Sequence, residues 1–388
     1  MRRYQLKSLA ALVALAAAAA ACSPDGATST SPASTASGAK GANDAAAAGA
    51  VYTLDNGAAA NHVIAFRRDA AGALTPLGAF ATGGAGTGGT VDPLTSQYAV
   101  VLSDDHRLLF AVDAGSDDVA SFRVAADGSL SLADREASGG DLPVSIAVHD
   151  RLLYVLNAGD NTLQGYRAAA SGQLVALPHA SATLAAGAAG AAAVRFTTDG
   201  RWLVVSERVS NRLETFPVLP DGRLGAPVVS ASSGNVPFGF DVTPSNDVIV
   251  SEAGSGAASS YALGAGGALT PVTASLSTGG RAPCWLIATA DGRFAYTANA
   301  GSGTITGFAV SSDGQLSLLT AGGATGVTGA GSTPLDLDLA ANDRLLYVLE
   351  AGTGNVGGFA VGADGSLTPI GTAPAGAPAS GLQGLAAY

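Results

Sequence analysis

The hydrophobic residues of this chain recur in one arrangement that is repeated along its length. The stretch "LLYVLNAGDNTLQGY" (152–166) returns as "FAYTANAGSGTITGF" (294–308) and as "LLYVLEAGTGNVGGF" (345–359). Each copy has an apolar run, a turn of small and polar residues, and a run in which apolar and polar residues alternate. A period of two, interrupted by Gly-containing turns, predicts antiparallel β-hairpins rather than helices.

Two markers count the copies. A Gly-containing turn followed by Leu occurs seven times at spacings of 44 to 56 residues, at Leu74, Leu130, Leu174, Leu224, Leu269, Leu316 and Leu367. An apolar run that ends in Asp, Asn or Glu also occurs seven times, at Asp55, Asp113, Asn157, Glu207, Glu252, Asn299 and Glu350. Each unit contains four predicted strands, so the pattern predicts an all-β fold, a seven-bladed β-propeller with four antiparallel strands per blade.

The two ends of the repeat region indicate how the ring closes. The region begins at Val51 with "VYTLDNG", which matches the second strand of a unit and has no first strand before it. It finishes with "GLQGLAAY" (381–388), a first strand with no successors. We therefore expect one propeller over residues 51–388, closed by pairing of the C-terminal strand into the first blade.

The residues before the propeller predict export. Residues 1–22 combine a basic start, "MRRYQLK", with the short apolar run "SLAALVALAAAAA", as in a signal peptide. Cys22 follows small residues, where bacterial lipoproteins are cut and acylated, and secretion without a lipid is the alternative. Residues 23–50 hold no large apolar residue and predict a disordered tether. We expect a lipid-anchored protein of the bacterial envelope, with the outer membrane as the favoured address.

Charge and composition narrow the partners. Residues 51–388 contain no Lys, and their 15 Arg against 28 Asp and Glu give a net charge of −13. This disfavours nucleic acid, leaves the N-terminal lipid as the only membrane contact, and excludes Lys-based catalysis and P-loop phosphate binding. None of the four His has a zinc-binding spacing, and we expect no metal, no cofactor and a monomer.

Candidate site residues follow from the innermost strands. One alternating set, which includes Tyr98, is almost purely apolar and is expected to pack between blades. The other set holds all the charge, and if it faces the central channel it places a ligand site there, made of Arg195, Asp241, Asp336, Asp338 and Trp285. The alternative is a water-filled channel that tolerates these charges.

The seven Asp, Asn and Glu residues at the ends of the second strands form a second candidate group. In six of them Gly follows two residues later, so for Asp and Asn we expect ordinary turns, with the side chain accepting from its own turn and Gly at positive φ. Glu207 has no such Gly and is the member expected to carry chemistry.

The motifs "YVLNAG", "AYTANAGSGTITGF", "DGRFAY" and "ADGSLTPI" resemble the lactonase-type seven-bladed propellers, which include 6-phosphogluconolactonase and carboxymuconate-cyclising enzymes. In those enzymes one inner strand opens with Gly-Pro-Arg-His and a Glu ends the following strand. The matching stretch here is "GAAAVRF" (190–196), which keeps Gly190 and replaces the Arg and His by alanines, while Glu207 matches the Glu.

Two functions are consistent with this pattern. The missing Arg-His pair and the tether favour a binding module on the cell envelope, with an envelope protein, a glycan or a small anionic molecule as its partner. The alternative is a hydrolase or isomerase of a sugar lactone or related anionic molecule. In that alternative Glu207 is the general base and Arg195 holds the anion.

Overall fold

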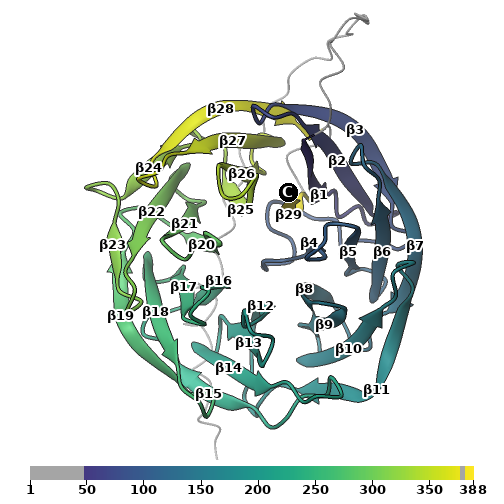
Figure 1. Cartoon of the computed structure of the whole chain (residues 1–388). Helices are drawn as coiled ribbons and strands as arrows, with labels where there is room; N and C mark the ends of the chain where they lie inside the picture. The colour runs from purple at the N-terminus through teal and green to yellow at the C-terminus, as the bar shows by residue number, and fades with distance from the viewer. Residues whose placement is uncertain (1–47, 376–380) are drawn as a thin grey trace, which may run out of the picture.

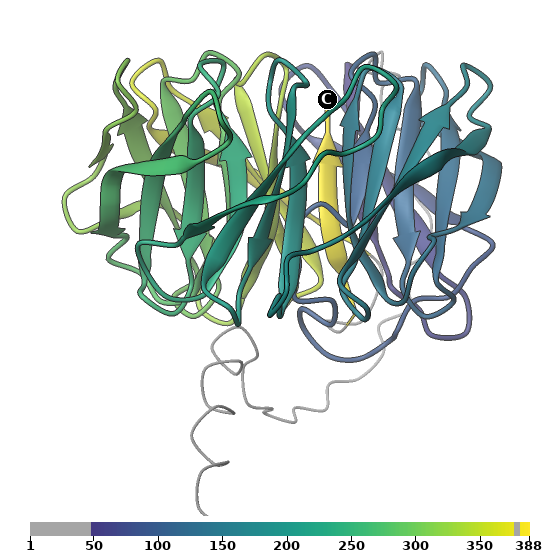
Figure 2. The same ribbon diagram turned by 90° about the horizontal axis from the view of Figure 1, so that it is seen from below.

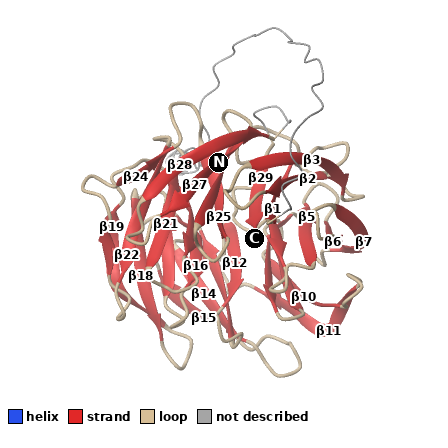
Figure 3. Ribbon diagram, turned by 45° about the horizontal axis from the view of Figure 1, so that its top comes forward, coloured by secondary structure: helices blue, strands red, loops and turns tan. Residues whose placement is uncertain are grey.

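The computed structural model describes residues 48–375 and 381–388. The predicted signal peptide, Cys22 and most of the tether therefore lie outside the described residues. Every regular element of the described chain is a strand (Figure 3), and these strands form seven antiparallel sheets around a central axis (Figure 1). The predicted seven-bladed propeller is confirmed.

The blades are numbered in chain order, each from its innermost strand outward. Blade 1 contains β29 (Gln383–Ala387), β1 (Gly49–Leu54), β2 (His62–Arg68) and β3 (Leu74–Ala81). Blade 2 contains β4 (Val100–Leu102), β5 (Leu108–Asp113), β6 (Asp118–Val124) and β7 (Leu130–Ala137). Blade 3 contains β8 (Pro143–His149), β9 (Leu152–Asn157), β10 (Thr162–Ala168) and β11 (Leu174–Thr183).

Blade 4 contains β12 (Ala191–Phe196), β13 (Trp202–Glu207), β14 (Arg212–Pro217) and β15 (Val228–Ala231). Blade 5 contains β16 (Pro237–Val242), β17 (Val248–Glu252), β18 (Ala257–Leu263) and β19 (Leu269–Ser277). Blade 6 contains β20 (Pro283–Ala288), β21 (Phe294–Asn299), β22 (Thr304–Val310) and β23 (Leu316–Leu318), with the extra β24 (Ala324–Val327) on β22. Blade 7 contains β25 (Pro334–Ala340), β26 (Leu345–Glu350), β27 (Asn355–Val361) and β28 (Leu367–Pro374).

The ring closes through the C-terminal strand, as predicted. β29 pairs antiparallel with β1, with Tyr52 opposite Ala386. The Thr53 hydroxyl donates to the Gly384 carbonyl at 2.7 Å, and Arg68 Nε donates to the Tyr388 carbonyl at 3.0 Å. β1 begins at Gly49, two residues before the expected start of the propeller.

The two faces of the disc differ in which strand ends they carry. The innermost strand of each blade ends on the face that carries Tyr388, here called the C-terminal face, which is uppermost in Figure 2. The second strand of each blade runs the other way and ends on the opposite face. The seven Asp, Asn and Glu residues, Glu207 among them, therefore lie on the face opposite the C-terminus.

Each blade is fastened to the next by the same hydrogen bond. The Gly before each marker Leu has positive φ, from 80° to 92°, which makes it the natural residue for the turn. Its carbonyl accepts from a hydroxyl of the preceding blade, and the seven donor–acceptor pairs are Tyr52–Gly128, Ser121–Gly172, Tyr154–Gly222, Thr215–Gly267, Ser260–Gly314, Tyr296–Gly365 and Tyr347–Gly72. The repeat in the sequence is thus also a repeat of contacts between blades.

The expected Asx-turns on the opposite face are largely wrong. Asp55 does accept from the Gly57 amide at 3.0 Å, but Asp113 accepts from Asn61 and Thr82 of the preceding blade. In the six blades that have it, the Gly two residues after the Asp, Asn or Glu is outside the positive-φ region and is needed for close approach. A Cβ on Gly115, for example, would lie 2.1 Å from the Gly86 carbonyl oxygen. In six blades the residue with positive φ comes four residues after the Asp, Asn or Glu that ends the second strand. It is Asp, Asn or Gly in each case: Asp117, Asn161, Asn211, Gly256, Gly303 and Gly354.

One segment departs from the repeat and crosses the channel. Residues 92–98, here called the channel loop, lie between β3 and the short β4, where the ribbon bends toward the axis (Figure 1). Ser96, Gln97 and Tyr98 are buried and bond to the innermost strands of all six other blades, at Gln383, Val144, Ala192, Phe240, Leu286 and Asp336. The loop fills the channel from the face opposite the C-terminus.

Candidate functional site

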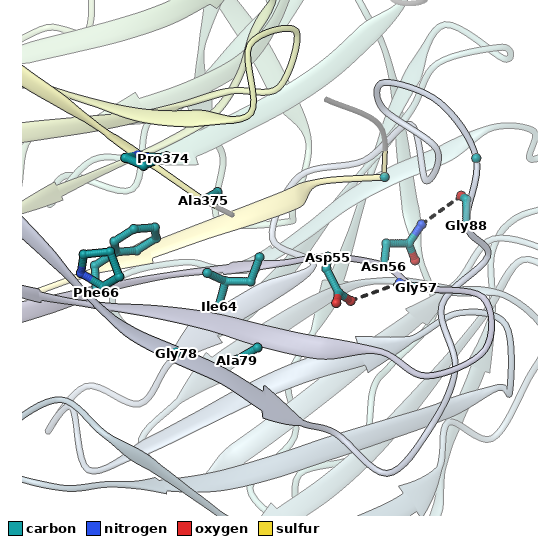
Figure 4. Close-up of a pocket in the computed structure, with 13 residues that line it drawn as sticks. Asp55, Asn56, Gly57, Ile64, Phe66, Gly78, Ala79, Gly88, Pro374 and Ala375 are labelled. Carbon is teal, nitrogen blue, oxygen red and sulfur yellow. Dashed lines mark hydrogen bonds between the residues drawn. The ribbon is translucent and has the colours of Figure 1, made fainter. Parts of the chain in front are cut away.

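One cavity lies at the seam between blades 7 and 1 and has a volume of about 780 Å³. Its polar side chains are engaged: Asp55 accepts from the Gly57 amide in its own turn, and Asn56 donates to the Gly88 carbonyl in the loop after β3 (Figure 4). Its wall includes Ala375 and Gly381, which flank the five residues that the structure does not describe. We therefore assign no site to this cavity.

A second cavity, of about 500 Å³, lies on the axis and opens on the C-terminal face. The innermost strands β4, β12, β16, β20, β25 and β29 line it, together with turns on that face. The channel loop closes its inner end, since Tyr98 is part of the lining and donates its hydroxyl to the Phe240 carbonyl at 2.7 Å. The cavity is therefore a blind pocket rather than an open channel.

Arg195 and Asp241 form an ion pair in the wall of this central cavity. Arg195 Nε lies 2.6 Å from Asp241 Oδ1, and the guanidinium lies over the Tyr98 ring, 4.8 Å from its centroid. The Asp241 side chain is 3% exposed and the Arg195 side chain is 39% exposed. Burial alone would lower the pKa of Arg195, but the carboxylates of Asp241 and Asp338 raise it, so this side chain stays charged.

Asp338 supplies a second carboxyl to the same cavity. It is half-buried, with Oδ2 accepting from the Ala387 amide and Oδ1 from the Leu339 amide, both at 2.8 Å. Burial raises its pKa to about 7, although both amides and Arg195 oppose the shift. A carboxyl with this pKa is partly ionised at neutral pH, which suits a group that takes up and returns a proton.

Asp336 and Trp285 lie deeper, behind the channel loop. Asp336 is buried and accepts from the amides of Tyr98 and Leu337, and burial raises its pKa well above the usual range. Trp285 is fully buried, and its Nε1–H donates to the Ser96 carbonyl at 2.8 Å. Of the five channel residues expected from the sequence, Arg195, Asp241 and Asp338 line the cavity, whereas Asp336 and Trp285 hold the channel loop.

Glu207 lies at the far end of its hairpin. In the β12–β13 register it is opposite Ala191, whereas Arg195 is opposite Val204. Three strand residues separate the two positions, or about 10 Å of strand. Sequence reasoning assigned one small substrate to Glu207 and Arg195, and the structure does not bring these residues together.

The Glu207 carboxylate is also fully engaged. It is 0% exposed and lies 3.0 Å from Arg212 Nε. It accepts further bonds from the Ser210 hydroxyl and the Ala189 amide. Nearby, where the family enzymes have Arg and His, the buried Ala192 gives its carbonyl to the Gln97 amide at 3.1 Å. This end of the channel is filled with packed backbone.

Sequence reasoning missed Tyr98 as a cavity residue. The alternating pattern placed it between blades, but its φ of 69° turns the chain out of the strand and toward the axis. The signal was loop length, because 18 residues, 82–99, join β3 to β4, whereas five, 138–142, join β7 to β8. Connections of this length within a compact domain commonly carry function.

In residues 48–375 and 381–388 no group of three or more His, Cys, Asp or Glu side chains could hold a metal ion. The same part of the chain has no helix long and apolar enough to cross a membrane.

Comparison with known proteins places the chain in a family. It matches "Lactonase, 7-bladed beta-propeller" over residues 57–183, 150–285, 248–332 and 278–382. No curated protein matches the chain. Solved structures similar in fold include a Lactobacillus plantarum protein, with a TM-score of 0.70 and 20% identity over 88% of this chain and 99% of that one.

Two further structures have names that mention lactones. A candidate 6-phosphogluconolactonase from Bacteroides fragilis has a TM-score of 0.68 and 16% identity, covering 89% of this chain and 98% of its own. The periplasmic gluconolactonase of Pseudomonas aeruginosa has a TM-score of 0.64 and 19% identity, covering 86% and 98%. Identities this low show a common fold. With the family match, which spans nearly the whole propeller, they show that the chain belongs to the lactonase family of seven-bladed β-propellers.

Proposed function

We propose that this protein hydrolyses a small lactone in the central cavity on the C-terminal face. The observation that carries the proposal is the pairing, in one blind pocket, of a half-buried carboxyl with pKa about 7 and a fixed guanidinium. Lactone hydrolysis needs a base for water and a positive group for the developing oxyanion, and this cavity holds one of each. Membership of the lactonase family supports the same reaction class.

The reaction can be written with the residues present. Ionised Asp338 takes a proton from a water molecule as the water oxygen bonds to the lactone carbonyl carbon. The carbonyl oxygen becomes an oxyanion beside the Arg195 guanidinium, which Asp241 holds in place through Nε. The tetrahedral intermediate then re-forms the carbonyl and breaks the ring C–O bond. The ring oxygen leaves with the proton from Asp338, which yields a hydroxy acid and regenerates the carboxylate.

The first test is lactone hydrolysis by the purified protein, followed by proton release and corrected for spontaneous ring opening. Replacing Asp338 by Asn removes the base, and we expect kcat/KM to fall about 100- to 10,000-fold. Glu207→Gln is the matched control, because it alters the residue that family resemblance nominates but lies outside the cavity, and its rate should stay within about twofold of wild type. Loss of activity in Glu207→Gln with retention in Asp338→Asn would overturn the proposed site.

The pH profile is a second readout of the same assay. A base must be ionised to act, and burial raises the pKa of Asp338 to about 7. kcat/KM should therefore rise about tenfold per pH unit below pH 7 and level off above it. A profile that is flat from pH 5 to 8 would exclude Asp338 as the base.

Export and envelope binding stay as proposals beside the lactonase. The periplasmic location named for the Pseudomonas aeruginosa relative supports export of this chain, and the signal-like residues 1–22 support it independently. Lipid attachment at Cys22 is a prediction from the sequence. The envelope binding module favoured by the sequence has weaker support than the lactone hydrolase, since the family match and the central cavity both favour chemistry on a small molecule.

A further inference from the structure

The charges around the central cavity bear on which lactone it accepts. Four carboxyl groups line it, from Asp104, Asp241, Asp338 and Asp343, against one guanidinium, that of Arg195. Asp241 already neutralises that guanidinium at 2.6 Å. Burial lowers the pKa of His106, the other basic residue in the lining, so its ring is neutral at neutral pH.

The rim carboxyls are fixed in place by backbone amides. Asp104 Oδ2 accepts from the Asp150 amide at 2.9 Å, and Asp343 Oδ2 accepts from the Ala290 amide at 2.7 Å. These groups cannot swing away from an approaching anion without losing those bonds. A phosphate dianion entering the cavity would meet negative charge and no unpaired cation.

The rest of the wall is mixed, since Ser103, Thr198 and Thr289 also line it and apolar side chains lie beside them. Val101, Ile287, Leu339 and Leu385 contribute to the lining between the polar groups. Apolar surface suits the C–H faces of an uncharged ring, and the volume of about 500 Å³ is in the range that holds a small organic ligand.

We infer that the substrate is an uncharged lactone without a phosphate group, and that repulsion from the acidic wall expels the carboxylate product. This inference rests on the proposed function. It departs from the sequence-based expectation of an anionic substrate held by Arg195, because Asp241 already balances the positive charge of that guanidinium. The acidic wall would thus repel negatively charged substrates as they enter, and it would repel the carboxylate product after ring opening.

The test compares two lactones that differ by one phosphate group, D-glucono-1,5-lactone and its 6-phosphate. We expect kcat/KM to be at least tenfold higher for the uncharged lactone at low ionic strength. Raising the salt concentration should narrow that difference, because screening weakens repulsion of the phosphate and leaves the uncharged lactone unaffected.

A double variant checks the source of the discrimination. Asp104→Asn with Asp343→Asn removes two rim charges and keeps the side-chain oxygens that accept the amides. We expect the ratio of kcat/KM for phosphorylated over unphosphorylated lactone to rise about two- to tenfold. Asp127→Asn with Asp364→Asn is the matched control, because both residues lie in exposed outer turns. The ratio should stay at the wild-type value in that control.

The outcomes separate the two proposals. Hydrolysis with preference for the phosphorylated lactone, or equal rates that ignore salt, would overturn the inference and leave lactone hydrolysis standing. No change of ratio in the rim variant would also overturn it. Hydrolysis of neither lactone would overturn the proposed function, and the inference with it.

Discussion

Glu207 ends β13, and its position could be predicted from the sequence whereas its partner could not. Its position after an apolar run correctly located the end of β13, and the absence of the usual Gly two residues later marked it as unusual. In the structure Glu207 pairs with Arg212, five residues on, at 3.0 Å, and Arg212 also pairs with Glu214 at 2.9 Å. The alternating pattern gives a side of the strand and says nothing about which side chains meet across it, so this partner could not be predicted.

The Arg212 cluster gives a testable consequence for stability. Both carboxylates are fully buried and share one cation that is 15% exposed, so Arg212→Met leaves two buried acids without a counter-charge. We expect the free energy of unfolding at pH 8, measured in urea, to fall by about 3–5 kcal/mol.

The same variant should be less damaging at low pH. Burial, with Glu207 next to it, raises the pKa of Glu214 to about 7 in the folded protein. A raised carboxyl pKa means that the folded state binds more protons than the unfolded state between pH 4.5 and 7, so protonation at pH 5 relieves the unpaired charge. Arg223→Met, which breaks an exposed pair with Asp221, should leave the urea midpoint unchanged at both pH values. Equal losses at pH 5 and pH 8 would contradict this assignment.

Some residues of the central cavity could be predicted from the alternation of side chains along the innermost strands. Arg195, Asp241 and Asp338 follow the period of two along their strands, so alternation alone put them on the axis. Depth along the axis was not predictable, because it depends on what else occupies the channel. Asp336 is two residues from Asp338 and has the same side-chain direction, yet the channel loop covers one and leaves the other in the cavity.

At the scale of elements, the sequence repeat predicts features that occur in every blade and does not predict the channel loop, which occurs once in the described chain. The hydroxyl–Gly bonds between blades belong to the repeat, and the marker Leu identified all seven of their turns. The channel loop is an insertion before β4 of blade 2. Its position depends on hydrogen bonds made by Ser96, Gln97 and Tyr98, and the other blades of the described chain have no such loop. Gly239 shows how tightly it fits, because a Cβ there would lie 2.0 Å from Gln97 Oε1.

The channel loop also bears on the proposed location of the chemistry. At one end of the axis it packs against the buried alanines that stand in place of the family Arg and His, where the Gln97 amide donates to the Ala192 carbonyl. The other end keeps a cavity with a carboxyl and a guanidinium. A single inserted loop therefore separates the position suggested by family resemblance from the position suggested by geometry.

At the scale of the whole molecule, the ring depends on its last strand. β29 supplies the innermost strand of blade 1, and its Gln383 donates to the Ser96 carbonyl at 2.9 Å, so it also anchors the channel loop. Deleting residues 381–388 should expose the edge of β1 and release the loop from one of its six partner blades. We expect aggregation, or a melting temperature lower by more than about 10 °C, measured by light scattering and thermal denaturation. A truncated chain that stays monomeric and melts with the intact protein would contradict closure by this strand.

The proposed location of the active site is tested most directly by a crystal structure of Asp338→Asn soaked with D-glucono-1,5-lactone. The variant keeps the shape of the cavity and lacks the base, so the lactone should persist in it. We predict density for the ring in the central cavity on the C-terminal face, with its carbonyl oxygen beside Arg195 and its carbonyl carbon facing the substituted side chain at position 338. Ligand bound instead on the opposite face beside Glu207, or an empty cavity at saturating lactone, would contradict the proposed site.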